Sequence, residues 1–228
     1  MSNFPHSPAG GDATHRVGAI VVAAGLSRRM DGVDKLFLPL AGTPLLGHTL
    51  AAIHTVSSIR HVVLVLNRSN FQMGRALVAE RGLGKVVRVC QGGASRRESV
   101  RLGLQVLPPC DWVVVHDGAR PCVEPELIER GLQEARRWGS AVAAVPLHDT
   151  LKVADAKGEV VTATLDRQGV WAVQTPQVFS WQTLSEAHRQ GGEDATDDAA
   201  LVERLGLKVH LYPGSSANIK EICRFRSI

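Results

Sequence analysis

Short apolar runs alternate along this chain with longer stretches in which apolar residues recur at helical spacing. Residues 17–24 are small or apolar without a break, are rich in valine, and end at Gly25. This pattern is typical of a strand that is buried on both faces of a parallel sheet. We expect further strands at residues 61–66, 85–89, 112–116, 141–145 and 209–212.

The stretches between these runs carry the spacing of amphipathic helices. We expect helices at residues 45–56, 70–81, 95–107 and 125–138. Strands that alternate with helices of this length form right-handed βαβ units on a parallel sheet. The sequence therefore predicts an α/β protein with a Rossmann-like open, mostly parallel sheet and helices on both faces.

The segment from about residue 149 to 174 breaks this alternation. It contains the turn signal Ala156-Lys157-Gly158 and alternates polar with apolar residues, which favours a protruding β-hairpin arm. A two-stranded arm cannot bury both of its faces alone. We therefore expect it to pack on a second subunit and to make the protein a homodimer.

Domain organisation and compartment follow from composition. Residues 1–16 contain Pro5 and Pro8 but no apolar core of a signal peptide, so we expect a disordered tail before a single domain at 17–228. No apolar run approaches the ~20 residues of a membrane span. The 4 cysteines show no metal-ligand spacing, which favours reduced thiols in a cytoplasmic protein.

The net charge of +4 is too small and too scattered to predict a nucleic-acid-binding face. Clusters of these charges can still serve small phosphorylated ligands. Ligands of open parallel sheets bind beyond the carboxyl ends of the strands, so the polar residues at those ends are the candidates for chemistry.

The first polar cluster is the turn after the first strand. Residues 23–30 read AAGLSRRM and are followed by Lys35. Small residues let backbone N–H groups approach an anion closely, and Arg28, Arg29 and Lys35 add positive charge. The turn is neither a Walker A loop nor a GxGxxG loop, so ATP and NAD are not implied. Read alone, it is equally a plain tight turn with solvated basic residues.

Two further clusters follow later strands. Residues 91–100 read QGGASRRESV, in which paired glycines with Arg96 and Ser99 could hold a base or phosphate; an ordinary glycine turn with Ser95 as a helix cap is the alternative. Residues 116–121 read HDGARP, where Asp117 suits Mg²⁺ or, instead, caps the helix near Pro125. We expect His116 to be structural and not a catalytic base.

The remaining clusters flank the arm and follow the last strand. Asp149, Thr150 and Lys152 lead into the arm, residues 166–176 lead out of it, and Lys220 follows the run at 209–212. Any one of these side chains is more often a solvated surface residue than a ligand. Their concentration in loops at one end of the predicted strands favours a single anion-binding site.

Together these clusters resemble the 2-C-methyl-D-erythritol 4-phosphate cytidylyltransferase family of non-mevalonate isoprenoid biosynthesis. The resemblance runs from about Ala19 to Lys220 and lies in the segments VHDGARP, DTLK, LDRQGVW, QTPQVF, ATDDAAL and SSANIK. The opening AAGLSRRM is shared more widely among nucleotidylyltransferases, so it indicates the class of enzyme and not the substrate.

The resemblance implies a role for each matching residue. It implies catalytic cations at Arg29 and Lys35, and a homodimer in which Arg167 reaches the site from the arm of the second subunit. It implies Mg²⁺ near Asp117. The residues it implies for CTP binding are Ala23, Ala24, Gly25, Gly93, Arg96, Ser99 and Asp117, and those for substrate binding are Asp117, Arg120, Thr150, Arg167, Thr175 and Lys220.

The chain departs from the family at three places, of which the mildest is Gly118, where the family often has Ala. The family usually reads Pro-Lys-Gln around the catalytic lysine, whereas this chain reads Asp34-Lys35-Leu36. After Lys220 the family continues with a threonine and a helix, whereas this chain reads EICRFRSI, which is expected to weaken the packing behind Lys220.

The implied reaction is in-line attack of a substrate phosphate oxygen on the α-phosphorus of CTP, with release of pyrophosphate. It needs positioned cations and no covalent intermediate. Three alternatives remain at this point: a cytidylyltransferase for ribitol 5-phosphate or another sugar or alditol phosphate, a molybdopterin-nucleotide transferase, and a non-catalytic module that binds CTP.

Overall fold

The computed structural model describes residues 15–25, 34–190 and 195–220, and it has the predicted α/β architecture. A seven-stranded open sheet runs in the order β11-β7-β10-β6-β1-β4-β5. Only β10 is antiparallel to its neighbours, while the other pairings in this sheet are parallel. The strands of this sheet are β1 (Val17–Ala23), β4 (Ile59–Leu66), β5 (Val86–Gln91), β6 (Trp112–Asp117), β7 (Ser140–Pro146), β10 (Trp171–Ser180) and β11 (His210–Pro213).

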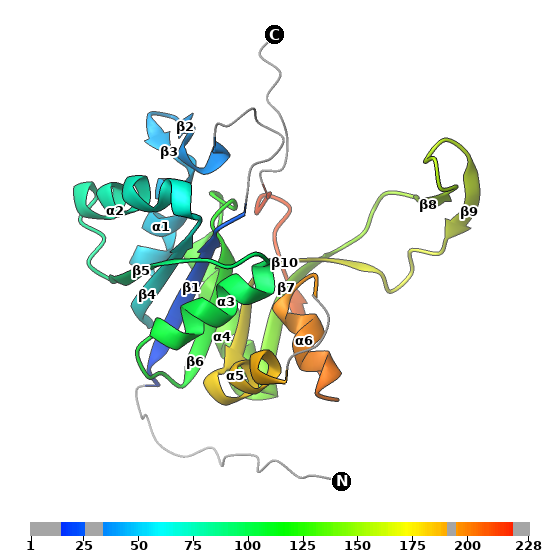
Figure 1. The fold of residues 1–228 in the computed structure, drawn as a ribbon. Helices are drawn as coiled ribbons and strands as arrows, with labels where there is room; N and C mark the ends of the chain where they lie inside the picture. The colour runs from blue at the N-terminus through cyan, green and yellow to red at the C-terminus, as the bar shows by residue number, and fades with distance from the viewer. Residues whose placement is uncertain (1–14, 26–33, 191–194, 221–228) are drawn as a thin grey trace.

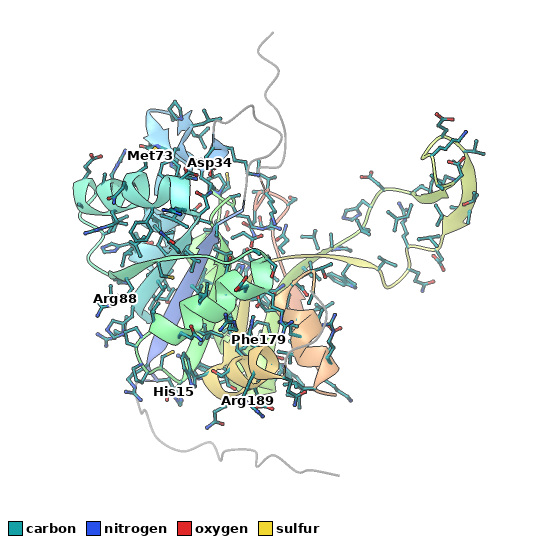
Figure 2. All side chains as sticks on the ribbon, in the orientation of Figure 1. His15, Asp34, Met73, Arg88, Phe179 and Arg189 are labelled. Carbon is teal, nitrogen blue, oxygen red and sulfur yellow. The ribbon has the colours of Figure 1, made fainter. Side chains whose placement is uncertain are left out.

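Helices cover both faces of the sheet, as predicted (Figure 1). One buried cluster joins the sheet to α1, α2 and α4, and a second joins it to α3, α5 and α6. Phe179 of β10 is fully buried in the second cluster with Leu184 of α5 (Figure 2). The helices are α1 (Leu45–Thr55), α2 (Phe71–Glu80), α3 (Arg96–Val106), α4 (Pro125–Trp138), α5 (Trp181–Arg189) and α6 (Asp198–Arg204).

The central strands are apolar without a break because both of their faces are covered. In β1, Val17, Ala19 and Val21 belong to the cluster of α1, α2 and α4, whereas Ile20 points to the opposite cluster. Side chains alternate across a strand, so a strand buried on both sides needs apolar residues at every position. This is the reason that the predicted strands and the observed ones coincide within two residues in the centre of the sheet.

The predicted helices are also confirmed, and local capping chemistry explains their ends. Ser95 caps α3, because its side chain accepts a hydrogen bond from the backbone N–H of Glu98. Helix α4 ends at Gly139, which adopts a left-handed conformation with φ of 85°. These caps place the start of α3 and the end of α4 where the sequence predicted them.

The prediction for residues 149–174 was wrong at its carboxyl end. The hairpin of β8 (Leu151–Ala154) and β9 (Val161–Leu165) does project from the body (Figure 1). Residue 171 already belongs to β10, which lies between β6 and β7. The polar side chains Gln174 and Gln177 are buried there, so the segment lacks the apolar run that identifies a central strand.

Pro176 is the second reason that the sequence does not predict strand β10. A proline inside a run normally argues against a central strand, because it cannot donate a ladder hydrogen bond. Here the pairing of β10 with β7 is interrupted between Val173 and Gln177, so Pro176 lies where no ladder bond is required. Helices α5 and α6 were not predicted either.

The remaining short elements lie near one end of the sheet. They are η1 (Lys35–Phe37), η2 (Arg68–Asn70), β2 (Pro39–Leu40) and β3 (Thr43–Pro44). No helix in the described part of the chain is long and apolar enough to cross a membrane. Within the same ranges Cys90, Cys110 and Cys122 are free thiols. The predicted tail lies mostly outside the described residues, and the sheet begins at Val17.

Candidate active site

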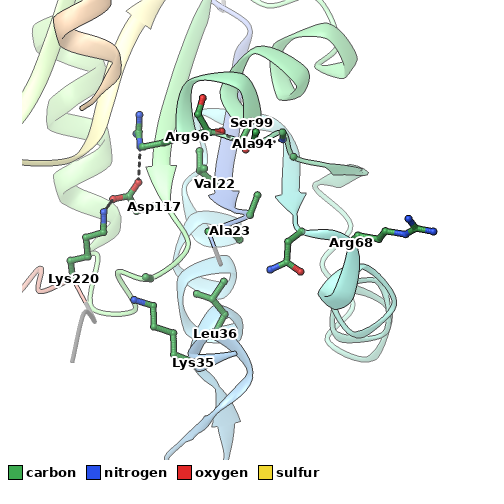
Figure 3. A pocket seen from close by; sticks show the side chains of 17 residues that line it. Val22, Ala23, Lys35, Leu36, Arg68, Ala94, Arg96, Ser99, Asp117 and Lys220 are labelled. Atoms are coloured by element: carbon green, nitrogen blue, oxygen red, sulfur yellow. Dashed lines mark hydrogen bonds and ion pairs between the residues drawn. The ribbon is translucent and has the colours of Figure 1, made fainter. Parts of the chain in front are cut away.

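A cavity of about 650 Å³ opens at the carboxyl ends of the parallel strands, which is where an open α/β sheet binds ligands (Figure 3). Its walls are the turn after β1, the residues after β4 and β5, the start of α3, the end of β6, and the turn that carries Lys35. The described residues that line it are Val22, Ala23, Ala24, Gly25, Lys35, Leu36, Asn67, Arg68, Gly92, Gly93, Ala94, Ser95, Arg96, Ser99, Asp117, Ala119 and Lys220.

Two turns meet closely at one wall of the cavity. A Cβ atom at Gly92 would lie 2.4 Å from the Cβ atom of Ala24 and 2.6 Å from Oγ of Ser99, so only glycine fits there. Ser99 holds the loop together: its Oγ donates to the carbonyl of Ser95 and accepts from N–H of Gly93. The structure thus brings the predicted residues Ala24, Gly93 and Ser99 into one wall.

Asp117 lies at the centre of the positive charge in the cavity. Its carboxylate is 2.7 Å from Nζ of Lys220 and 3.4 Å from Nε of Arg96, and Nε of Arg120 is 3.9 Å away. Burial alone would raise the pKa of Asp117, but Arg96 and Lys220 outweigh it and hold the pKa at about 2. The side chain is therefore an anion at neutral pH and does not cap α4, whose N-cap is Glu124.

Arg96 is held between two carboxylates. Its Nη1 donates to Asp198 at 2.7 Å while its Nε faces Asp117. Asp198 is fully buried, and its second oxygen accepts a hydrogen bond from His188 at 2.8 Å. Burial acts to lower the pKa of Arg96, but Asp198 and Asp117 raise it above its usual value. Sequence reasoning missed Asp198 and His188, because α5 and α6 were not predicted.

Lys35 enters the cavity from the short turn η1. Asp34 caps this turn, and Leu36 next to Lys35 is buried with an exposed fraction of 4%. Lys35 and Lys220 both line the cavity, so cations from opposite ends of the chain face the same space. The second predicted catalytic cation, Arg29, lies outside the described residues.

The predicted residues Arg120 and Thr175 lie behind the cavity wall and not among its lining residues. Thr175 is buried, and its Oγ1 accepts from the backbone N–H of Asp117 at 3.0 Å. Arg120 is buried as well and donates to the carbonyl of Asn218 at 2.6 Å. In the structure these two side chains therefore support Asp117 and the loop that carries Lys220.

The loop of Lys220 is fastened by residues that the sequence did not single out. Asn218 is fully buried, and its Nδ2 donates to the carbonyl of Thr175 at 2.8 Å. Gln174 donates to the carbonyl of Ser215 at 2.9 Å and accepts from the backbone N–H of the same residue. These bonds satisfy the buried amides and join the loop of Lys220 to β10.

Two predicted substrate residues are not part of this cavity. Thr150 and Arg167 lie at the base of the hairpin, and both are exposed. Arg167 donates to the carbonyl of His148 in the segment between β7 and β8. One chain alone therefore does not bring them to Asp117.

His116 precedes Asp117 in β6 but is fully buried, and it is not among the described residues that line the cavity. Burial lowers its pKa to about 4, so the imidazole is neutral at pH 7. A buried neutral side chain that does not face the cavity is structural, as the sequence predicted.

The described residues contain no group of three or more His, Cys, Asp or Glu side chains that could hold a metal ion. A single carboxylate at the cavity is nevertheless compatible with Mg²⁺, because this ion commonly uses one or two carboxylates and takes its other ligands from substrate phosphates and water. The low pKa of Asp117 keeps that carboxylate ionised.

Comparison with known proteins agrees with this geometry. The model of the family described as 2-C-methyl-D-erythritol 4-phosphate cytidylyltransferase matches residues 17–224. A relative of that name from Dehalococcoides mccartyi is 47% identical over 205 residues, which cover 90% of each chain. Another from Pelotomaculum thermopropionicum is 44% identical over 212 residues and covers 90% of this chain and 88% of its own length.

Solved structures show the same fold. The crystal structure of 2-C-methyl-D-erythritol 4-phosphate cytidylyltransferase from Thermus thermophilus is 34% identical, with a TM-score of 0.73 over 91% of this chain and 93% of its own. The crystal structure of 4-diphosphocytidyl-2C-methyl-D-erythritol synthase from Anaerococcus prevotii is 27% identical, with a TM-score of 0.78 over 91% of this chain and 92% of its own.

Proposed function

This chain belongs to the 2-C-methyl-D-erythritol 4-phosphate cytidylyltransferase family, and from that premise we propose how its cavity carries out the reaction. The enzyme joins CTP to 2-C-methyl-D-erythritol 4-phosphate, forming 4-diphosphocytidyl-2-C-methyl-D-erythritol and pyrophosphate in non-mevalonate isoprenoid biosynthesis. Membership of this family removes the ribitol phosphate, molybdopterin and non-catalytic alternatives.

One observation carries the assignment of the site: the ionised carboxylate of Asp117 lies between Arg96 and Lys220 in a cavity that Lys35 also lines. Such an array suits two phosphorylated ligands that must be brought together although both are anions. The cations offset the repulsion between the ligands, and Asp117 keeps the cations in fixed positions.

CTP would lie along the wall made by Ala23, Ala24, Gly25 and Gly93. In the turn after β1, Ala23, Ala24 and Gly25 carry at most a methyl group, so its backbone N–H groups can approach the phosphates closely, whereas the N–H of Gly93 is bonded to Ser99. Arg96 would contribute to nucleotide binding from the start of α3. Ser99 keeps the loop in shape through its bonds to Gly93 and Ser95.

The 4-phosphate of the substrate would attack the α-phosphorus from the side of Lys220. A new P–O bond forms as the bond from the α-phosphorus to the bridging oxygen breaks, and pyrophosphate leaves with the bonding electrons. A phosphate monoester is already an anion at neutral pH, so no general base is needed. The burial of His116 away from the cavity agrees with this.

Lys35, together with Arg29, would stabilise the negative charge that builds up on the phosphate oxygens in the transition state. Mg²⁺ would be held by Asp117 and the phosphates, and when bound it supplies further positive charge to the triphosphate. Asp117 would then have two roles, since the carboxylate that holds Arg96 and Lys220 would also be a ligand of the ion.

The arm would complete the substrate site of a second subunit. Its strands β8 and β9 expose Val153, Val161 and Leu165, which a partner subunit would cover. Arg167 and Thr150 lie at the base of this arm, so dimerisation would bring them to the partner's cavity. Arg120 and Thr175 would act on the substrate from behind Asp117, through the carboxylate and the loop of Lys220.

The test is release of pyrophosphate from CTP and Mg²⁺, with 2-C-methyl-D-erythritol 4-phosphate and ribitol 5-phosphate offered in parallel. We expect turnover with the first compound and little with the second. Equal turnover with both would show that the cavity selects for a phosphorylated polyol and not for the branched methyl compound. Binding of CTP with no turnover of either compound would contradict the assignment of the catalytic cations.

A further inference from the structure

The turn that carries Lys35 is tied to the end of the neighbouring strand β4 by one carboxylate. Asp34 stands directly before Lys35, at the place where proline is usual in the family. Its Oδ1 accepts from the backbone N–H of Leu36 at 3.0 Å, which caps η1. Its Oδ2 accepts from the side-chain amides of Asn67, at 3.3 Å, and Asn70.

The two asparagines present their amide groups to Asp34 because other bonds fix them. Oδ1 of Asn67 accepts from the backbone N–H of Asn70 at 3.0 Å and from Oγ of Ser69 at 2.7 Å. Since this oxygen is engaged twice, the NH₂ group of Asn67 must point the other way, toward Asp34. Asn70 is buried, with an exposed fraction of 3%.

This arrangement turns the charge of Asp34 away from the ligands. Lys35, Leu36, Asn67 and Arg68 line the cavity, whereas Asp34 is not among its described lining residues. A carboxylate beside the triphosphate would oppose binding, but here its oxygens are occupied by N–H donors behind the wall. The side chain of Asp34 lies near the amino-terminal end of α2 (Figure 2).

Hydrogen bonds within the turn shape its backbone. N–H of Phe37 bonds to the carbonyl of Asp34, and N–H of Leu38 bonds to the carbonyl of Lys35. Leu36 is buried in the cluster that also contains Leu66 at the end of β4. These contacts shape the turn, and the carboxylate of Asp34 fixes its position relative to β4.

We propose that Asp34 is a positioning residue, which holds the turn of Lys35 against Asn67 and Asn70 so that the ammonium group faces the reacting phosphates. This inference rests on the proposed role of Lys35 as a transition-state cation. A small displacement of such a cation is costly, because its contribution depends on preorganised geometry. Asp34 therefore acts on the reaction only through Lys35.

The test is a double-mutant cycle of Asp34→Ser with Lys35→Ala, measured as kcat and KM for CTP. Serine can still cap the N–H of Leu36, but it is too short to reach the two asparagines. In the otherwise unchanged enzyme we expect kcat to fall about tenfold, while KM for CTP changes less than about twofold. In the Lys35→Ala background we expect Asp34→Ser to have no further effect.

Two further variants keep the test decisive. Asn70→Ala removes one of the two amide groups that bond to the carboxylate of Asp34, and it should also lower kcat. When it is combined with Asp34→Ser, kcat should fall no further than with Asp34→Ser alone. Glu80→Gln, on the exposed far end of α2, removes the same unit of charge without touching the turn and should leave kcat unchanged.

The outcomes separate this inference from the proposed function. If Asp34→Ser lowers kcat by the same factor in both backgrounds, or lowers the melting temperature and leaves kcat alone, Asp34 is structural and the inference is overturned. If Lys35→Ala itself keeps full activity, the role of Lys35 is wrong, and that failure is seen whatever Asp34→Ser does.

Discussion

At the scale of single residues, the site depends on charges whose environment is set by burial and by close partners. Asp117 is buried and yet ionised, because Arg96 and Lys220 stabilise its carboxylate more than burial disfavours it. At His116, next to it in the chain, burial lowers the pKa more than the charge of Asp117 raises it, and the imidazole is neutral. Adjacent residues of one strand thus differ in charge at pH 7 because they point to opposite faces of the sheet.

Replacement of Lys35 by alanine tests the proposed catalytic cation. We expect kcat for pyrophosphate release to fall by about 10²–10³, or roughly 3–4 kcal/mol, which is the usual effect of removing one preorganised donor. Steady-state kinetics at saturating CTP measure this loss. Lys208→Ala, which removes an exposed lysine that is not among the described lining residues, serves as the matched control. Full activity of the Lys35→Ala enzyme would exclude this residue from the chemistry.

The neutral state of His116 predicts an acid-sensitive stability. Its pKa is about 4 in the folded protein, below the ordinary value near 6.5, so the unfolded chain binds a proton more readily. The free energy of unfolding should therefore fall as pH decreases from about 6.5 to about 4, by roughly 3 kcal/mol from this residue alone. His116→Leu should remove this part of the slope in urea titrations, and an unchanged slope would contradict the assignment.

At the scale of elements, the cavity exists because two turns approach within contact distance. The turn after β1 and the turn after β5 meet at Ala24 and Gly92, and Ser99 at the first turn of α3 completes the contact. The close approach of these turns makes them one continuous wall of the cavity. This geometry requires a small residue at each of the two turns.

Gly92→Ala tests this contact. The added Cβ would lie 2.4 Å from the Cβ atom of Ala24, a distance at which one of the turns must move. We expect KM for CTP to rise about tenfold or more, because the nucleotide wall is widened, while the fold is retained. Gly84→Ala is the control, since nothing lies within 4 Å of a Cβ atom at that position. Unchanged CTP binding by Gly92→Ala would remove this wall from the nucleotide site.

The interrupted strand β10 links several of these elements. In and directly beside the interruption, Thr175 bonds to the backbone of Asp117, Gln174 to the loop of Lys220, and Gln177 to Asp197 at the start of α6. The polar residues that kept β10 from being predicted are thus the ones that bond to Asp117, to the loop of Lys220 and to α6.

At the scale of the whole molecule, one chain forms the cavity with its charged centre but does not bring Thr150 and Arg167 to it. The hairpin carries Arg167 and Thr150 away from Asp117, although the family resemblance assigns both to the same substrate. A homodimer with exchanged arms resolves this difference, because each cavity would receive Arg167 from its partner.

Mixing two inactive variants tests the exchange of arms. Arg167→Ala should raise KM for the methylerythritol phosphate and leave CTP binding nearly unchanged. When Arg167→Ala and Lys35→Ala proteins are unfolded, mixed and refolded together, half of the dimers should be mixed, each with one intact site. We expect about a quarter of the wild-type activity at limiting substrate to return. No recovery would show that Arg167 acts within its own chain or not at all.

The sequence by itself determined the class of fold, the central strands with their helices, and the positions of most lining residues. It could do so because strands buried on both faces leave an unbroken apolar run, and because ligand-binding turns follow such runs directly. Lys35, Arg96, Asp117 and Lys220 were all identified in this way, and all line the cavity.

Only the tertiary structure decided the place of β10 in the sheet. It also decided that Asp198 and His188 support Arg96, and that the carboxylate of Asp34 bonds to Asn67 and Asn70. These features join residues that are far apart in the chain or polar residues that are buried. Local patterns of hydrophobicity carry no sign of such contacts, because each partner is satisfied only when the whole sheet has formed.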